Sequence, residues 1–540
     1  MPPPSREFAA DAAISHALLT AALGVRLRVE TEPLRTVRHE WFDTFDWRLD
    51  RAGLILERAS GPHGDRTHLL LRDSSGELLL LAPAPPAVIT ASGGPEAFLL
   101  EALVPAGPLR DRLAGVVQIR ALLPLARVTA QACTFRVVDA QAKTLARIVV
   151  EEPTGRSRRS LGPGCRLRVV PVRGYQGQAD RLVRLLAGLP GLRPSSGGWL
   201  PGALEELGRR PGDYTGQLQL SLAATMPASA AVQAIMARLL SVAERNMPGV
   251  LADLDTEFLH DLRVSVRRAR TALKLMGDVL PAGDVVHLVG DLKWMGDLTT
   301  PTRDLDAYLL AMDATGAEGT RGAELKPFLD FLGVRRQLAQ RALVRGLRSP
   351  RWARALQRWC ALATDEPEVT KDGEAAAGGR PIGEVAPPRI ARTYRRARRL
   401  GEAITEASPA TDLHALRKRC KELRYLLEFF ASLLNQRPYR TVLGQLKELQ
   451  DCLGEFQDAQ VQRAAVSAFA DEMLAAGGTS AATFMAMGRA ADAVESRQGQ
   501  ARAQFAERFE RFANKRTRRN VADLTMAQPA PQPRPGPRRP

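Results

Sequence analysis

Cysteine is scarce in this chain of 540 residues, which contains only five. Their number is odd and none belongs to a CxxC pair, so the pattern indicates neither a disulfide framework nor a zinc site. Long apolar runs are missing as well, because no stretch approaches the ~20 apolar residues that a membrane-spanning helix needs. The cysteines are Cys133, Cys165, Cys360, Cys420 and Cys452.

A basic segment followed by an apolar one is also missing from the amino terminus, Met1–Ser5. This argues against a secretory signal. Together with the scarcity of cysteine, it leads us to expect a soluble protein without membrane insertion, located in the cytoplasm.

Aromatic residues make up only 5% of the chain, and acids are outnumbered. The 76 Lys and Arg against 59 Asp and Glu give a formal net charge of +17. Such an excess predicts affinity for polyanions: nucleic acid, an anionic membrane or polyphosphate. Few aromatics leave few platforms on which nucleic-acid bases could stack.

The length favours two domains, and the residue patterns differ between the two parts. Residues from about 25 to 175 form short apolar runs separated by Gly, Pro, Ser and Asp, which is typical of an antiparallel sheet or barrel. A helix is expected over Gln178–Leu189. The predicted strands are Arg35–Phe42, Leu54–Arg58, Thr67–Arg72, Glu77–Leu81, Thr134–Val138, Ala146–Glu151 and Arg166–Val172.

From about residue 220 the apolar period becomes helical. We therefore predict an α+β chain, with an antiparallel β tunnel or barrel over residues 1–215 and an all-α, internally duplicated helical bundle over 216–522. The halves of the bundle are expected at about 220–363 and 389–520, joined by a linker over 364–388. The Pro- and Arg-rich segment 523–540 is expected to be disordered.

Two segments of the helical part match each other without a gap. The first is His260–Lys274 (HDLRVSVRRARTALK) and the second is His414–Glu428 (HALRKRCKELRYLLE). The offset, 414 − 260 = 154, also relates residues outside this helix. It pairs Arg238 with Arg392, Arg245 with Arg399, Lys293 with Lys447, Asp297 with Asp451, and Asp304 with Asp458. A duplicated multi-helix unit explains such agreement.

The basic residues of each repeat recur at steps of three and four, so they share one stripe of a helix, while an apolar stripe faces the core. Like charges at this spacing repel by a few tenths of a kcal/mol per pair, which a helix selected only for stability would avoid. A basic run is most often a solvated surface. Two copies in the same register, each begun by a histidine, favour an anion-binding face, and arginine suits it because its planar fork holds two phosphate oxygens.

The pattern of His260, Arg263 and Arg267, with a later lysine and the sequence Arg303–Asp306 (RDLD), resembles the CHAD domain. This resemblance covers roughly residues 220 to 520. It implies a helical bundle pair whose central basic groove binds long-chain polyphosphate. The implied groove residues are His260, Arg263, Arg267, Arg270, Lys274 and Lys293 in one half and His414, Arg417, Lys418, Lys421, Arg424 and Lys447 in the other, with Arg392, Arg395, Arg396 and Arg399 as a further basic helix.

Asp304 and Asp458 occupy equivalent positions of the two copies. We interpret them as structural, pairing with an arginine or capping a helix. The alternative is that the paired acids hold a metal ion that bridges to phosphate.

The segment Trp41–Leu49 (WFDTFDWRL), followed by Ala52–Arg58 (AGLILER), resembles the CYTH superfamily. The resemblance covers about residues 10 to 195 and implies an eight-stranded antiparallel tunnel that, in active members, hydrolyses or cyclises triphosphates with a divalent metal. Active members open with Glu-x-Glu-x-Lys, which is absent before Phe42. Glu30–Glu32 supplies only its first half, and Glu151 and Glu152 are too few, so we expect a degenerate tunnel without enzyme activity.

The sequence therefore predicts a protein that binds inorganic polyphosphate and other polyanions, without a cofactor or catalytic residue, at polyphosphate granules where these exist. A nucleic-acid binder is the first alternative, because the same stripes would hold a phosphate backbone. A metal-dependent triphosphatase in the N-terminal domain is the second.

Overall fold

The computed structural model describes residues 7–10, 28–60, 67–85, 97–154, 164–195, 198–314, 320–364 and 378–525, together with positions 14, 17, 19 and 21. The chain divides into two compact units, Met1–Gly216 and Gln217–Pro540. The expected disordered tail beyond residue 525 and residues 365–377 of the expected linker lie outside the described residues.

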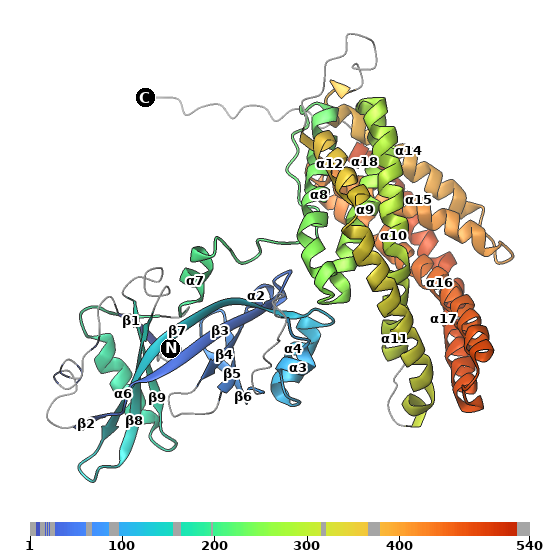
Figure 1. Ribbon diagram of the computed structural model, residues 1–540. Coiled ribbons are helices and arrows are strands. Elements are labelled where there is room, and N and C mark those ends of the chain that lie inside the picture. Colours follow the sequence, from blue (N-terminus) through green and yellow to red (C-terminus); the bar gives the residue numbers. More distant parts are fainter. Residues whose placement is uncertain are drawn as a thin grey trace, which may run out of the picture. The chain divides into compact units, whose positions relative to one another are not determined.

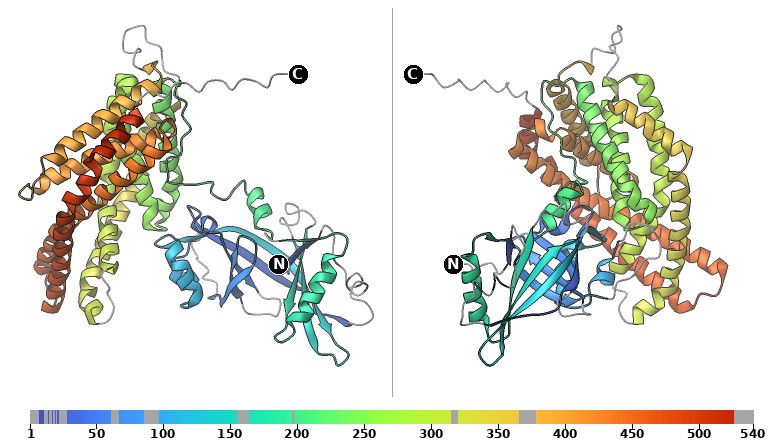
Figure 2. Two further views of the ribbon diagram at one scale, coloured as in Figure 1. Left: turned by 180° about the vertical axis from the view of Figure 1, so that it is seen from behind. Right: turned by 60° about the vertical axis from the view of Figure 1, so that its left-hand side comes forward.

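The first unit is built on one antiparallel sheet in the order β10-β1-β9-β8-β7-β3-β4-β5-β6, with β2 paired to β7 (Figure 1). The sheet curls strongly (Figure 2) but β6 and β10, its two edges, do not pair within the described strands, so it is a half-barrel. This confirms the predicted class of fold. The strands are β1 (Glu7–Ala10), β2 (Arg28–Thr31), β3 (Arg35–Thr44), β4 (Leu54–Ser60), β5 (Thr67–Asp73), β6 (Leu78–Pro83), β7 (Leu122–Val138), β8 (Thr144–Pro153), β9 (Cys165–Pro171) and β10 (Leu192–Pro194).

Every predicted strand overlaps an observed one, but β1, β2, β10 and the first half of β7 were not predicted. The three missed strands have only three or four residues each, too few to establish an alternating pattern. The short helices α2 (Arg48–Arg51), α3 (Leu100–Leu103), α4 (Pro108–Val117) and α7 (Leu200–Glu206) accompany the sheet. The predicted helix is α6 (Gln176–Ala187), which buries Leu182 and Leu186 among side chains of β8 and β9.

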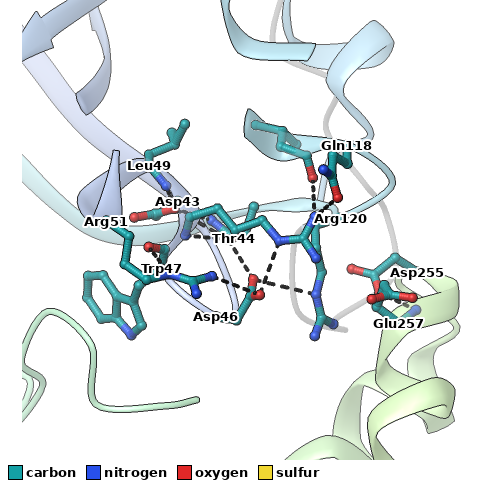
Figure 3. Close-up of polar contacts among 12 residues, drawn as sticks. Asp43, Thr44, Asp46, Trp47, Leu49, Arg51, Gln118, Arg120, Asp255 and Glu257 are labelled. Atoms are coloured by element: carbon teal, nitrogen blue, oxygen red, sulfur yellow. Dashed lines mark hydrogen bonds and ion pairs between the residues drawn. The ribbon is translucent and has the colours of Figure 1, made fainter. Parts of the chain in front are cut away.

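The turn between β3 and α2 is organised by two aspartates (Figure 3). Asp43 is buried and accepts hydrogen bonds from the backbone amides of Thr44, Leu49 and Asp50 at 2.6, 2.8 and 2.9 Å. Burial nevertheless raises the pKa of Asp43 to about 6. Asp46 lies between the guanidinium groups of Arg51 and Arg120, at 3.1 and 3.5 Å. These aspartates therefore fix the local chain path.

We expect Asp43→Ala to destabilise the β-rich unit by about 2 kcal/mol, because backbone amides that Asp43 now satisfies lose their acceptor. Chemical unfolding monitored by tryptophan fluorescence measures the change. Asp50→Ala is the matched control, since Asp50 is exposed on the same short helix. Equal stability of the two variants would show that the turn does not depend on the Asp43 carboxylate.

In its described residues, the second unit contains two successive sets of five α-helices with corresponding neighbours (Figure 1). In each set the first helix packs on the second and the fifth, and the second packs on the third. The long α16 and α17 lie side by side, with α11 next to α17 (Figures 1 and 2). The first set is α8 (Ala228–Ala252), α9 (Thr256–Met276), α10 (Ala282–Ala314), α11 (Thr320–Leu347) and α12 (Pro350–Thr364); the second is α14 (Ile382–Glu402), α15 (Ala410–Phe429), α16 (Gln436–Ala476), α17 (Ala481–Ala513) and α18 (Lys515–Thr525).

The two sets are related by a local twofold axis. The backbone amide of Ala228 donates to the carbonyl of Arg380 at 2.9 Å, and that of Ile382 donates to the carbonyl of Met226 at 2.8 Å. Ala228 is equivalent to Ile382 and Met226 to Arg380 under the 154-residue offset, so the two hydrogen bonds are equivalent to each other. Pro227 and Pro381, which are equivalent residues, form a bridge between them. A contact in which equivalent residues face each other is the mark of twofold symmetry.

The linker expected over residues 364–388 is shorter than predicted, because α14 already begins at Ile382. Pro387 and Pro388 suggested a loop, yet both lie inside this helix. The amides of Ile382 and Gly383 are bonded to carbonyls that precede α8, which anchors the first turn of α14 despite the two prolines. In the part of the chain that the structure describes, no helix combines the length and apolarity needed to cross a bilayer.

Candidate functional site

The two histidine-led helices, α9 and α15, cross each other in an antiparallel sense. Arg268 of α9 pairs with Glu428 of α15 at 2.6 Å, and Lys274 pairs with Glu422 at 2.7 Å. Arg268 is equivalent to Glu422, and Lys274 to Glu428, so the two ion pairs exchange under the local twofold. The crossing therefore brings the basic stripes of both repeats to the same region.

Lys421 of α15, four residues before Tyr425, is half-buried near this crossing. Burial and the neighbouring charges of Arg267 and Arg417 lower the pKa of Lys421 to about 8, with Arg424 adding to the effect and Asp458 opposing it. Arg267 comes from α9, in the other repeat, and its Nε donates to the Tyr425 hydroxyl at 2.9 Å. Cations of both repeats thus share one surface.

Arg263 is held at this surface by the neighbouring helix α10. Its Nη1 donates to the carbonyl of Gly296 and to the hydroxyls of Thr299 and Thr300, at 3.1, 3.1 and 2.7 Å. Burial lowers the pKa of Arg263, as do the charges of nearby cations, while an acid of α10 opposes them. We call the shared surface the central cluster, and it comprises Arg263, Arg267, Arg303, Arg417, Lys421 and Arg424.

The equivalent aspartates Asp304 and Asp458 border the central cluster. Arg417 donates to Asp458 at 3.0 Å, which confirms the predicted pairing of this acid with an arginine. Burial raises the pKa of Asp304, against the attraction of Arg263 and Arg303, and Asp458 across the twofold raises it further. Among the described residues, no group of three or more His, Cys, Asp and Glu side chains is arranged to hold a metal ion.

Two guanidinium nitrogens of the central cluster lack partners. Arg303 Nη1 and Arg417 Nε are buried, and neither has a hydrogen-bond partner among the described residues. Buried polar atoms are normally bonded, so such donors indicate a site where an acceptor is to be supplied.

The other predicted residues are placed less centrally. His414 Nδ1 lies 2.8 Å from Gln457 Oε1, and His260 is half-buried on α9. Arg424 also pairs with Glu428, at 2.7 Å. Several further cations are exposed and form no ion pair within the described part of the chain, namely Arg270, Lys293, Lys418, Lys447, Arg392, Arg395, Arg396 and Arg399.

Sequence reasoning missed the acids beside the basic stripe of α15. Glu422 pairs with Arg419 at 2.6 Å as well as with Lys274 from the other repeat. The spacing of Arg424 and Glu428, four residues apart, was the signal that could have revealed one of these pairs. Arg303, from the RDLD sequence, was also not assigned to the site.

The half-barrel of the first unit encloses a second charged cluster. Arg72 of β5 pairs with Glu7 of β1 at 2.9 Å and with Glu57 of β4 at 3.3 Å. Arg166 of β9 pairs with Glu7 at 2.8 Å and approaches Glu57 at 3.8 Å. Since β1 and β5 lie far apart in the sheet order, these ion pairs span the interior of the curl.

His39 of β3 completes this interior network. Its Nδ1 lies 2.6 Å from Glu57, and its Nε2 lies 3.6 Å from Glu151. Although burial opposes it, the two carboxylates raise the pKa of His39 to about 9. Burial alone would raise the pKa of Glu151. The pKa is nevertheless lowered to about 2 by the charges of His39, Arg168 and Arg166. Glu57 and Glu151 are therefore ionised, and they and Glu7 are each paired with a cation of the chain itself.

These positions correct two expectations from the sequence. Glu151 is buried within the sheet, where it is one of several acids, whereas the sequence offered only Glu151 and Glu152 as acids near each other. The first strand of the sheet is β1, with the single acid Glu7, whereas the first half of the motif was sought at Glu30–Glu32. Glu30 lies on β2 and pairs with Arg136 of β7.

The chain is similar to known proteins over part of its length. Residues 234–467 match the model of the CHAD domain family. The uncharacterized proteins Rv2226 and MT2285, from two strains of Mycobacterium tuberculosis, are 29% and 28% identical over 216 residues, which is 38% of this chain. The chain matches only 39% of the length of these relatives.

Two solved structures match part of the chain. The crystal structure of the CHAD domain from the plant Ricinus communis is 25% identical, with a TM-score of 0.43, covering 57% of this chain and 96% of that structure. PptA from Streptomyces chartreusis is 18% identical, with a TM-score of 0.42, covering 53% of this chain and 100% of that structure.

The segment that matches the family model begins within α8 and ends within α16, so it contains both histidine-led helices and all of the central cluster. The helical unit of this chain therefore contains a CHAD domain.

Proposed function

We propose that the central cluster binds inorganic polyphosphate. The observation that carries the proposal is the crowding of cations from both repeats around half-buried Lys421, whose pKa is lowered to about 8. Like charges in a partly desolvated surface repel each other, and a polyanion laid across them removes that repulsion. The unpartnered nitrogens of Arg303 and Arg417 are donors that phosphate oxygens would satisfy.

The local twofold supports a linear phosphate chain as the ligand. A polyphosphate chain is chemically the same when read in either direction, so it presents equal groups to both halves of a twofold surface. A single nucleic-acid strand has a direction and carries bases. Tyr425, an aromatic residue in contact with the central cluster, is buried and bonded to Arg267, so it offers no face on which a base could stack.

Where polyphosphate granules exist, we further propose that the protein associates with them through the same surface. Nucleic-acid backbone binding stays the alternative, because phosphodiester chains also satisfy arginine forks. The two are separated by comparing polyphosphate, DNA and RNA at matched ionic strength.

We expect the double variant Arg267→Glu/Lys421→Glu to weaken binding of long-chain polyphosphate at least tenfold, about 1.4 kcal/mol. The reason is that one cation is reversed on each side of the twofold. Affinity should also fall less steeply with salt in this variant, because fewer counterions are released. Titration at several salt concentrations, with thermal melts to check folding, measures both effects.

The matched control for this variant is Lys326→Glu/Arg345→Glu, which makes the same change of net charge on exposed positions of α11. It should bind polyphosphate nearly as the wild type does. If the two double variants lose the same affinity, binding follows net charge alone and the central cluster is not the site.

The pKa of Lys421 predicts a pH dependence that an ordinary lysine would not give. Polyphosphate favours charged Lys421, so affinity should be constant below pH 7 and should fall as pH rises through about 8 towards 10. Lys421→Arg should retain its affinity over this range, because arginine stays charged. Titrations of both proteins from pH 6.5 to 10 test this, and parallel curves would contradict the assignment.

For the first unit, we propose a degenerate tunnel domain that does not hydrolyse triphosphates. The interior acids Glu7, Glu57 and Glu151 are each matched by Arg72, Arg166 or His39. A divalent ion needs carboxylates whose charge is available to it, so these residues do not fit such a metal. This supports a scaffold rather than an enzyme.

Purified protein should release no phosphate from tripolyphosphate or ATP with Mg²⁺ or Mn²⁺ above the rate of a protein-free blank. The variant Glu57→Gln/Glu151→Gln, assayed in parallel, identifies any activity that depends on the interior acids. Metal-dependent turnover by the wild type that disappears in this variant would show that the domain is an enzyme.

A further inference from the structure

The outer face of α14 carries four arginines without acidic partners. Arg392, Arg395, Arg396 and Arg399 are exposed, and none of them forms an ion pair within the described part of the chain. The buried residues of α14, such as Ile390 and Ala397, lie on its other side. The steps of three and four place the arginines on one face, where they repel each other.

The neighbouring helix α18 is basic as well. Tyr394 of α14 donates its hydroxyl to the carbonyl of Phe512 at 3.1 Å, and the two rings pack 5.2 Å apart, just before α18 begins. Burial raises the pKa of Tyr394 to about 12, and the nearby charges of Arg398 and Arg518 act against this. Because Arg398 belongs to α14 and Arg518 to α18, the two basic helices adjoin at Tyr394.

Acids do little to neutralise this surface. On α14, Glu402 pairs with Arg398 at 2.7 Å. On α18, Asp523 is exposed at the far end of the helix. The cations of α18 form no ion pair within the described residues, and they are exposed: Lys515, Arg516, Arg518 and Arg519.

In the first repeat, two of these four charges are missing. Arg395 and Arg396 correspond to Ser241 and Val242 of α8, which takes the place of α14 in that repeat. The helix equivalent to α18 is α12, and two of its three arginines have partners. Arg351 stacks on Trp294 at 4.3 Å, and Arg358 pairs with Asp291 at 2.6 Å. Arg392 and Arg399 have basic counterparts in the first repeat, Arg238 and Arg245, so Arg395 and Arg396 distinguish the second repeat at this position.

The α14/α18 face is separate from the central cluster. The central cluster is made of residues of α9, α10 and α15, whereas the cations of the other face belong to α14 and α18. One surface follows the crossing of α9 and α15, and the other follows the packing of α14 on α18.

The chemistry of the α14/α18 face selects among polyanions. Val521 and Leu524, the apolar side of α18, are buried, so the helix has no apolar face to insert into an anionic membrane. Tyr394 is buried too, so it offers no ring for the stacking of bases. What remains is a row of guanidinium and ammonium groups, which suits a phosphate chain without bases or acyl chains.

We propose that the α14/α18 face is a second binding site for a linear phosphate chain, distinct from the central cluster. This inference rests on the proposed function, since it names the same ligand class for another surface. With two sites, one protein molecule holds two short chains or links two long ones. Long chains and protein therefore assemble into larger particles.

The test uses the full chain and the triple variant Arg395→Ser/Arg399→Ser/Arg519→Ser, which introduces serine as found at Ser241. Calorimetric titration with tripolyphosphate should give two bound chains for the wild type and one for the triple variant. Light scattering with long-chain polyphosphate should rise for the wild type and stay several-fold lower for the triple variant. Lys326→Ser/Arg341→Ser/Arg345→Ser, which removes three exposed charges from α11, should behave as the wild type.

The outcomes separate this proposal from the proposed function. If the triple variant matches the wild type in stoichiometry and scattering, the second site does not exist, whatever happens at the central cluster. If Arg267→Glu/Lys421→Glu keeps both bound chains while the triple variant loses one, the proposed function of the central cluster fails instead. A matched RNA that displaces polyphosphate from the α14/α18 face at equal phosphate concentration would overturn the assignment of the ligand.

Discussion

Mutual repulsion among cations is the constraint on which the helical unit depends at the crossing of α9 and α15. Arg267, Arg417 and Lys421 are held together by the packing of two helices that belong to different repeats. The fold tolerates this because Glu422, Glu428 and Asp458 balance charges at the border, whereas the middle stays positive. Folding thus forms a positive surface before any ligand binds, and a bound anion relieves the repulsion among its cations.

In the first unit, by contrast, charges of both signs are brought together. Its curled sheet brings charged side chains from six strands into a buried interior, where an unmatched charge costs several kcal/mol. Here the chain supplies both signs: Arg72, Arg166 and protonated His39 face Glu7, Glu57 and Glu151. The acids of this interior are paired within the chain, while Arg166 Nε and Nη1 have no hydrogen-bond partner among the described residues. The two units consequently use charge for different ends, one to hold its own sheet together and one to attract a partner.

Much of this organisation was visible in the sequence because it is periodic. Steps of three and four gave the stripes of α9 and α15, and the 154-residue offset gave the duplication and hence the equivalence of Asp304 and Asp458. Ion pairs between different helices or strands leave no such periodic pattern in the sequence. Glu422 meeting Lys274, or Glu7 meeting Arg72, depends on how helices and strands pack, and one sequence does not specify that packing. The four-residue β1 was missed because it is too short for an alternating pattern, and with it the acid that anchors the interior network.

The ion pairs at the helix crossing have a consequence for self-association. In the first repeat, positions 268 and 274 are both basic, and in the second repeat the equivalent positions, Glu422 and Glu428, are both acidic. Two copies of the first repeat, docked through this twofold, would place Arg268 against Lys274. Two copies of the second would place Glu422 against Glu428. Each repeat is therefore complementary to the other and repelled by its own kind, which disfavours pairing between like repeats of neighbouring chains during synthesis and refolding.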